Sequence, residues 1–365
     1  MLSDRPAAFG KVLQQPGSVA WSPDSERLAV ASGADLLLVD PKGRVVQSLP
    51  GINPVFIDWT PSRGLLVTAR GADGSTRVLA CHPRLEEHQP IPGTEGVAAA
   101  FGLWDARSVL ALRADIRSTD IGTFADIRLT LFGKGVPQEL GTTHANLPPD
   151  ISLEAYLSGW TVAGLRPFYD TFLTPRFQKP PMFPPYIGLS ALDPFTREVE
   201  PVGRLELKRY WVPVSWSPDG RVLAFPDQDG HLMSMEVGSG TAPRLVTQKF
   251  RGLYASWHPN RQVIFFGGFL VHPKGTPVSR IPGTREETLG VWSPDGRHLA
   301  MLDRNGLRIF PDVPIPPEAG PWKRSPPVLE ARDKLRDLKL LMRDGLITRE
   351  DYETRKQKHM EILAK

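Results

Sequence analysis

A short tryptophan-centred motif occurs three times in this chain and restricts its fold more than any other feature. It reads Trp-Ser-Pro-Asp at Trp21–Asp24, and Trp-Ser-Pro-Asp-Gly recurs at Trp216–Gly220 and Trp292–Gly296. Proline presets φ, aspartate can bond its own backbone and glycine can take φ > 0, so the motif predicts a tight turn. A Leu-Ala pair follows each copy, as expected at the start of a strand. Each copy therefore predicts a hairpin corner with a tryptophan at the end of its first strand.

Weaker versions of this corner occupy the rest of the chain, and their spacing predicts the fold. The seven predicted corners are at Trp21, Trp59, Trp104, Trp160, Trp216, Trp257 and Trp292. Successive corners are 35 to 56 residues apart, and each unit has room for about four strands. A spacing near 40–45 residues with several strands per unit is typical of the blades of a β-propeller. We therefore predict an all-β fold, a seven-bladed β-propeller of four-stranded antiparallel sheets, in which these tryptophans are structural.

The seventh unit is short, which raises the question of how the ring closes. Its last predicted strand, Gly306–Phe310, is followed at once by a run of prolines. We expect Phe9–Gln14, which precedes the first corner, to supply the missing outer strand. Such an N-terminal strand would close the ring and leave no open sheet edge.

The composition agrees with a fold that has many turns. The chain holds 37 prolines and 33 glycines in 365 residues, and proline is about twice as frequent as usual. Cys81 is the single cysteine, so no disulfide can form within the chain. No apolar run is long enough to span a bilayer, and the N-terminus lacks the pattern of a signal peptide. We expect a cytoplasmic protein that does not associate with membranes.

The net charge of +4 comes from the C-terminal part of the chain. From Lys323 to Lys365 there are 12 basic and 8 acidic side chains, so the rest of the chain is electrically balanced. A neutral body disfavours nucleic-acid binding. The basic tail alternates with acids, which is typical of a solvated helix face. Nucleic-acid binding through this tail is therefore the weakest of the functions that we consider.

The segment Arg166–Tyr186 interrupts the repeat pattern of the fourth unit. It is rich in proline and aromatic residues and carries three cations, so we expect a long loop rather than a helix or a central strand. The loop could fold back over the ring as a plug. It could also bind a protein partner, because aromatic and arginine side chains dominate binding hot spots. The candidate protein-binding residues are Phe172, Arg176, Phe177, Lys179, Met182, Phe183 and Tyr186.

The C-terminal part predicts a different structure. We assign residues 1–312 to the propeller, 313–327 to a proline-rich linker and 328–365 to two amphipathic helices. Gly345 is placed to end the first helix, and Thr348-Arg-Glu-Asp351 is a variant of a capping box. So short a hairpin buries too little surface to be stable alone, so it must pack on the propeller or on a second copy. Its predicted interface residues are Leu335, Leu338, Leu341, Met342, Leu346, Ile347, Tyr352, Met360 and Leu363.

Two family resemblances follow from these motifs. The Trp-Ser-Pro-Asp-Gly corners resemble the WD-type propeller repeats of TolB and of the propellers of oligopeptidases, which implies a fold rather than an activity. The stretch Lys334–Tyr352, with its leucines, Gly345, Thr348 and acidic residues, resembles the bacterial SHOCT module. That resemblance implies oligomerisation or docking.

Motifs that would carry catalysis are missing from the sequence. There is no Gly-x-Ser-x-Gly elbow, no His-Glu-x-x-His spacing and no phosphate-binding loop. The carboxylates of Asp115, Asp120 and Asp126 match no known metal loop. We therefore predict no cofactor and no enzymatic activity, but a scaffold for unidentified protein partners, with possible homo-oligomers through residues 328–365. The alternative is a small-ligand sensor or enzyme that uses the axial channel, as lactonase-like propellers do.

Overall fold

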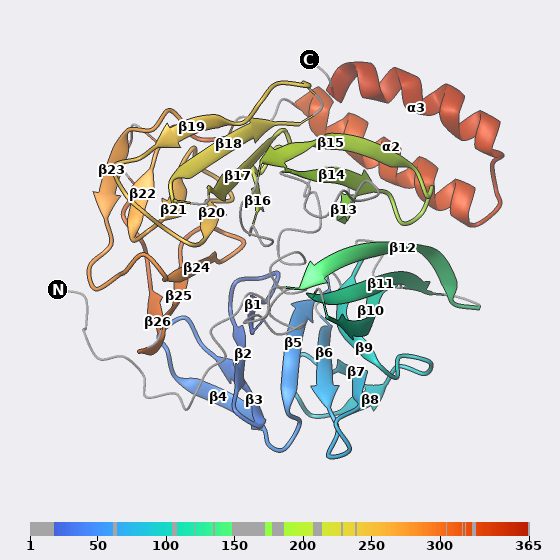
Figure 1. Cartoon of the computed structure of the whole chain (residues 1–365), viewed down its shortest axis with the longest axis horizontal. Helices are drawn as coiled ribbons and strands as arrows, with labels where there is room; N and C mark the ends of the chain where they lie inside the picture. Colours follow the sequence, from blue (N-terminus) through green and yellow to red (C-terminus); the bar gives the residue numbers. More distant parts are fainter. Residues whose placement is uncertain are drawn as a thin grey trace.

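The computed structural model describes residues 18–60, 64–103, 108–120, 122–133, 136–147, 172–176, 186–206, 214–227, 229–237, 239–303, 305–315, 317, 319–322 and 326–363. Within these residues the strands form seven antiparallel sheets, which lie around a ring and are followed by two helices (Figure 1). The predicted all-β propeller with a C-terminal helical hairpin is confirmed.

Five of the sheets have four strands each. They are β1 (Val19–Trp21), β2 (Leu28–Ser32), β3 (Asp35–Val39) and β4 (Val45–Leu49); β5 (Pro54–Trp59), β6 (Leu65–Arg70), β7 (Thr76–Cys81) and β8 (His88–Pro90); β9 (Val97–Gly102), β10 (Val109–Thr119), β11 (Gly122–Phe132) and β12 (Gln138–Leu147); β16 (Ser215–Trp216), β17 (Val222–Pro226), β18 (Leu232–Glu236) and β19 (Arg244–Thr247); and β20 (Ala255–Trp257), β21 (Ile264–Phe266), β22 (Phe269–Val271) and β23 (Pro277–Arg280).

The fourth and seventh sheets have three strands each among the described residues. They are β13 (Phe172–Arg176), β14 (Tyr186–Leu192) and β15 (Val199–Glu206), and β24 (Leu289–Trp292), β25 (Leu299–Asp303) and β26 (Gly306–Phe310). The segment Phe9–Gln14, which we expected to complete the seventh sheet, lies outside the described residues. The helices are α2 (Pro326–Arg343) and α3 (Arg349–Leu363), and no described helix is long and apolar enough to cross a bilayer.

The hydrophobic core consists of layers between neighbouring sheets. One layer joins Val30 of the first sheet to Leu302 of the seventh, which closes the ring from within. Another joins Ala29 to Val67 of the second sheet. Middle strands that are covered on both faces, such as Leu28–Ser32 and Leu65–Arg70, are almost wholly buried and do not alternate. In β3 and β11 buried and partly buried residues still alternate along most of the strand.

The corner motif forms the tight turn that its sequence predicts. In the first copy the Ser22 hydroxyl donates to Asp24 at 2.6 Å and accepts the backbone N–H of Arg27 at 3.0 Å. The second position after the proline takes a positive φ in each copy, at Ser25 (64°), Gly220 (70°) and Gly296 (75°). Glycine adopts this conformation without strain, whereas serine does so at some cost. The Ser25 hydroxyl accepts the backbone N–H of Asp295 at 3.0 Å, so this residue also joins the first sheet to the seventh.

The tryptophans connect neighbouring sheets. The indole N–H of Trp59 donates to the carbonyl of Ala20 at 2.9 Å, and that of Trp257 donates to the carbonyl of Ser215 at 3.1 Å. In each pair the acceptor lies immediately before the tryptophan of the preceding sheet. The rings are therefore structural links between blades. Trp104 and Trp160 lie outside the described residues.

The third sheet is longer than the others. Strands β10 and β11 have 11 residues each and pair along their whole length, so that Asp115 faces Asp126. Each aspartate forms an ion pair with an arginine of the opposite strand, Asp115 with Arg128 and Asp126 with Arg117. These ion pairs offset the repulsion between the two facing carboxylates. Asp115 and Asp126 thus stabilise a hairpin through these ion pairs.

The proline-rich segment after β26 packs against the propeller. Val313 and Ala319 are buried in the layer between the sixth and seventh sheets. The Trp322 ring meets that of Trp257 edge-on at 5.6 Å, and its backbone N–H bonds to Asn260 at 3.1 Å. The hairpin therefore begins only four residues after an anchored point of the chain.

Candidate interaction surface

The helical hairpin is built by two local caps. Gly345, with φ of 72°, ends α2, and the N–H of Leu346 bonds to the Leu341 carbonyl at 2.8 Å. The Thr348 hydroxyl accepts the N–H of Asp351, and the Asp351 carboxylate accepts the N–H of Thr348, both at 3.1 Å. These bonds satisfy backbone groups that helix ends otherwise leave unpaired. The predicted glycine cap and capping box are confirmed.

The hairpin docks on the turn between β14 and β15 of the fourth sheet, which joins the helices to the propeller (Figure 1). The contact is centred on an ion pair between Lys339 of α2 and Asp193, whose side chains are each 6% exposed. The Asp193 carboxylate also accepts the backbone N–H groups of Phe195 at 2.9 Å and Thr196 at 3.1 Å. A buried carboxylate needs such partners, since burying an unpaired charge costs several kcal/mol.

A second ion pair lies beside the first and involves α3. Lys356 bonds to Glu198 at 2.6 Å and lies over the Tyr352 ring at 5.5 Å. Burial would raise the pKa of Glu198, but hydrogen bonds from Lys356 and Glu353 outweigh it and hold this pKa below its usual range. Burial and the neighbouring Glu198 raise the pKa of Glu353. As the pH falls, Glu353 therefore takes up a proton before Glu198 does.

Tyr352 is the most enclosed side chain of α3. It is 1% exposed, and its hydroxyl has no hydrogen-bond partner among the described residues. Burial raises the pKa of this phenol, and the negative charges of Asp193 and Glu198 raise it further. The phenol therefore stays protonated and contributes mainly buried apolar area to the contact.

The structure places the predicted hairpin residues in three groups. Leu335, Leu338 and Tyr352 are buried, which agrees with a packed apolar stripe. The residues Leu341, Met342, Ile347 and Met360 are partly buried. Leu346 is 70% exposed at the tip between the helices. Leu363 ends α3, and its side chain is outside the described set.

The prediction of a long loop over Arg166–Tyr186 is wrong for the residues of that segment that the structure describes. Phe172–Arg176 forms β13, and Tyr186 begins β14, which pairs with both of its neighbours. Within the described residues β13 is an edge strand of its sheet, and an edge is a position where a proline such as Pro175, opposite Leu189, is tolerated. Phe172, Arg176 and Tyr186 are thus strand residues. The other candidate protein-binding residues lie outside the described part of the chain: Phe177, Lys179, Met182 and Phe183.

Sequence reasoning missed the charged residues that hold the hairpin. A usable signal was Lys339 itself, which lies within the apolar stripe between Leu335 and Met342. A lysine in that place either reaches solvent or meets an acid. The acid, Asp193, is distant in sequence and carries no motif that marks it as a partner.

A third group of polar side chains lies in the turn between β17 and β18. Asp227, Asp229 and His231 each offer an atom within 4.8 Å of the others, a spacing that could hold a metal ion. The Asp227 carboxylate, however, already accepts the N–H groups of Asp229 and His231, both at 2.8 Å. These bonds are those of a turn, so the group is explained by its structural role.

Comparison with solved structures agrees with the fold. The chain is similar to Kuenenia stuttgartiensis hydrazine synthase, with a TM-score of 0.55 and 13% identity over 85% of this chain and 99% of that one. It also matches the β-propeller domain of Myceliophteria thermophila Cps50 (Swd1), with a TM-score of 0.47 and 14% identity over 84% of this chain and 98% of that one. No family model and no curated protein sequence matches. At such identities the likeness to hydrazine synthase concerns the fold alone.

Proposed function

We propose that this chain is a non-enzymatic scaffold that binds other proteins in the cytoplasm, with the propeller as platform and the helical hairpin as an oligomerisation or docking module. The observation that supports it is the contact of the hairpin with the turn Asp193–Glu198. This turn holds two helices through buried and half-buried ion pairs. This turn of the fourth sheet is thus suited to binding helices.

The exposed tip of the hairpin is the contact surface in this proposal. Leu346 is 70% exposed, and the partly buried Ile347 lies beside it. Two capped helices hold the tip rigidly, which lowers the entropy that a partner must overcome. The resemblance of residues 334–352 to SHOCT modules supports the same role. Burial raises the pKa of the Cys81 thiol to about 12, so this thiol stays protonated and unreactive.

The experiment compares the full chain with two variants that change one exposed apolar residue each. Leu346→Asp alters the tip, and Val136→Asp is a matched control, because Val136 is 85% exposed in the connection between β11 and β12. Light scattering over a range of concentrations measures self-association, and quantitative affinity capture identifies partners. We expect an oligomer, or a reproducible partner, that the wild type and Val136→Asp share and Leu346→Asp loses. Identical masses and identical captured proteins for all three chains would contradict the proposal.

A further inference from the structure

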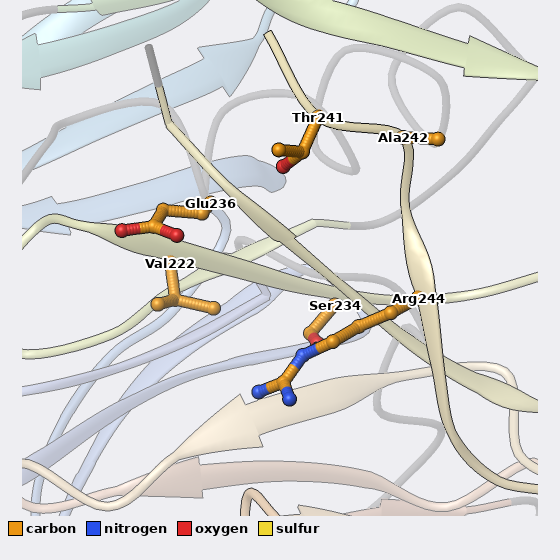
Figure 2. A pocket seen from close by; sticks show the side chains of 6 residues that line it. All are labelled: Val222, Ser234, Glu236, Thr241, Ala242 and Arg244. Carbon is orange, nitrogen blue, oxygen red and sulfur yellow. The ribbon is translucent and has the colours of Figure 1, made fainter. Parts of the chain in front are cut away.

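A pocket of about 300 Å³ lies on the fifth sheet, and none of its lining residues belongs to the helical hairpin. Its lining comes from three strands and from the connection between β18 and β19. The lining residues are Val222, Ser234, Glu236, Thr241, Ala242 and Arg244 (Figure 2). Its volume is at the small end of the range for ligand sites, so an occupant would be a small molecule.

Strand register explains why these side chains meet. Val222 of β17 pairs with Glu236 of β18, and Ser234 pairs with Arg244 of β19. Ser234 and Glu236 are two residues apart on one strand, so they share a face of the sheet. All four side chains therefore project to the same side, and Thr241 with Ala242 forms the lip.

The pocket carries opposite charges on two sides. Figure 2 shows the carboxylate of Glu236 and the guanidinium of Arg244 with Val222 between them. The Nε of Arg244 donates to the hydroxyl of Ser234 at 3.1 Å, and Ser234 is only 2% exposed. This bond fixes the guanidinium while its two Nη groups remain available. Within the described part of the chain, no ion pair joins Arg244 to Glu236.

We propose that this pocket binds a small zwitterion of the α-amino acid class. The Nη groups of Arg244 would donate to the ligand carboxylate in a bidentate contact, which is the geometry that guanidinium favours. The Glu236 carboxylate would bind the ammonium group. Val222 and Ala242 offer an apolar surface to the ligand side chain. A ligand that carries both charges makes both contacts, whereas a ligand with one charge makes only one of them. This site is independent of the proposed scaffold role.

The test uses the full chain and calorimetric titration with each of the neutral L-α-amino acids. The two site variants are Arg244→Gln and Glu236→Gln, and Arg251→Gln is the control, because Arg251 is exposed and does not line the pocket. We expect at least one amino acid to bind the wild type and the control equally. Each site variant is expected to weaken that binding tenfold or more. Because both altered side chains are exposed, the variants are expected to fold, which circular dichroism verifies.

Two derivatives of the best amino acid make the test specific. The N-acetyl derivative lacks the ammonium and the primary amide lacks the carboxylate. We expect the first to bind wild type and Glu236→Gln equally weakly, and the second to bind wild type and Arg244→Gln equally weakly. The proposal is overturned if none of the neutral L-α-amino acids binds the wild type at a ligand concentration on the order of 10 mM, at which even weak binding is detected. It is also overturned if both site variants bind as tightly as the wild type.

Discussion

The indole N–H of Trp21 donates a hydrogen bond to the backbone carbonyl of Val291 at 3.0 Å, across 270 positions of sequence. This bond joins the first sheet to the seventh and repeats the link that Trp59 makes to Ala20. The same corner residue therefore connects successive blades and also closes the ring.

Removal of the Trp21 indole N–H is expected to weaken that closure. Trp21→Phe leaves the Val291 carbonyl without its donor, which costs about 1 kcal/mol beyond the loss of ring volume. Trp292→Phe is the matched control, because Trp292 is equally buried and its indole N–H has no hydrogen-bond partner among the described residues. Urea unfolding measures the free energy of unfolding of both variants. A control that loses as much stability as Trp21→Phe would show that the hydrogen bond contributes nothing.

The buried pair of Lys339 and Asp193 is expected to hold the hairpin on the propeller. Lys339→Met leaves a buried carboxylate without its counter-ion, a change that costs about 3–5 kcal/mol. Hydrogen exchange should then become fast in both helices while the propeller strands stay protected. Lys334→Met on the same helix removes an exposed pair with Glu330 and should change stability by less than about 1 kcal/mol.

A double variant separates charge from packing at this contact. Lys339→Met with Asp193→Asn removes both charges, and the Asn oxygen can still accept the turn N–H groups. We expect the double variant to lose much less free energy of unfolding than Lys339→Met alone. Purely additive losses would indicate that the two side chains act independently.

His258 is expected to make the protein sensitive to acid. Burial lowers the pKa of this imidazole to about 4, from 6.5 in the unfolded chain. Between these pH values the unfolded state binds more protons, so stability falls as the pH falls from about 6.5 to about 4, by about 3 kcal/mol. His258→Ser should flatten this dependence in urea unfolding at several pH values. His88→Gln, which alters an exposed side chain on β8, should leave the slope as it is.

Asp58 is expected to lower the stability of the protein as the pH rises, which is the opposite of the effect of His258. Burial raises the pKa of this carboxyl from 3.8 to about 7, although it accepts the N–H of Gly102 at 2.9 Å. The folded state then binds more protons than the unfolded state, so stability falls as the pH rises from about 4 to about 7. Asp58→Asn can keep the bond to Gly102 and cannot ionise. It should be more stable than the wild type at pH 8, by about 4 kcal/mol, and closer to it at pH 5. Equal pH dependence in both proteins would rule out Asp58 as the titrating group.

Local turn chemistry made the propeller predictable. The corner at Trp292–Gly296 needs only its own serine, aspartate and glycine to form, and those residues are adjacent in sequence. The same holds for the caps at Gly345 and Thr348. The number of blades followed from the spacing of such corners.

Long-range partners were not predictable in this way. The prolines of Arg166–Tyr186 argued against a strand, but Pro175 pairs with Leu189 in β13, which is an edge strand among the described residues, and edges tolerate proline. Composition does not show which strands pair. The docking of Lys339 on Asp193 joins positions far apart in the chain, and nothing local to either residue specifies the other.

From the amino-acid order alone one obtains the repeated hairpins and the two helices, because their turns and caps are bonded among near neighbours. The tertiary structure decided where the hairpin sits, which charges are buried and how Glu236 and Arg244 share a pocket. Those outcomes depend on strand register and on the closing of a ring, which bring together groups that the chain keeps apart.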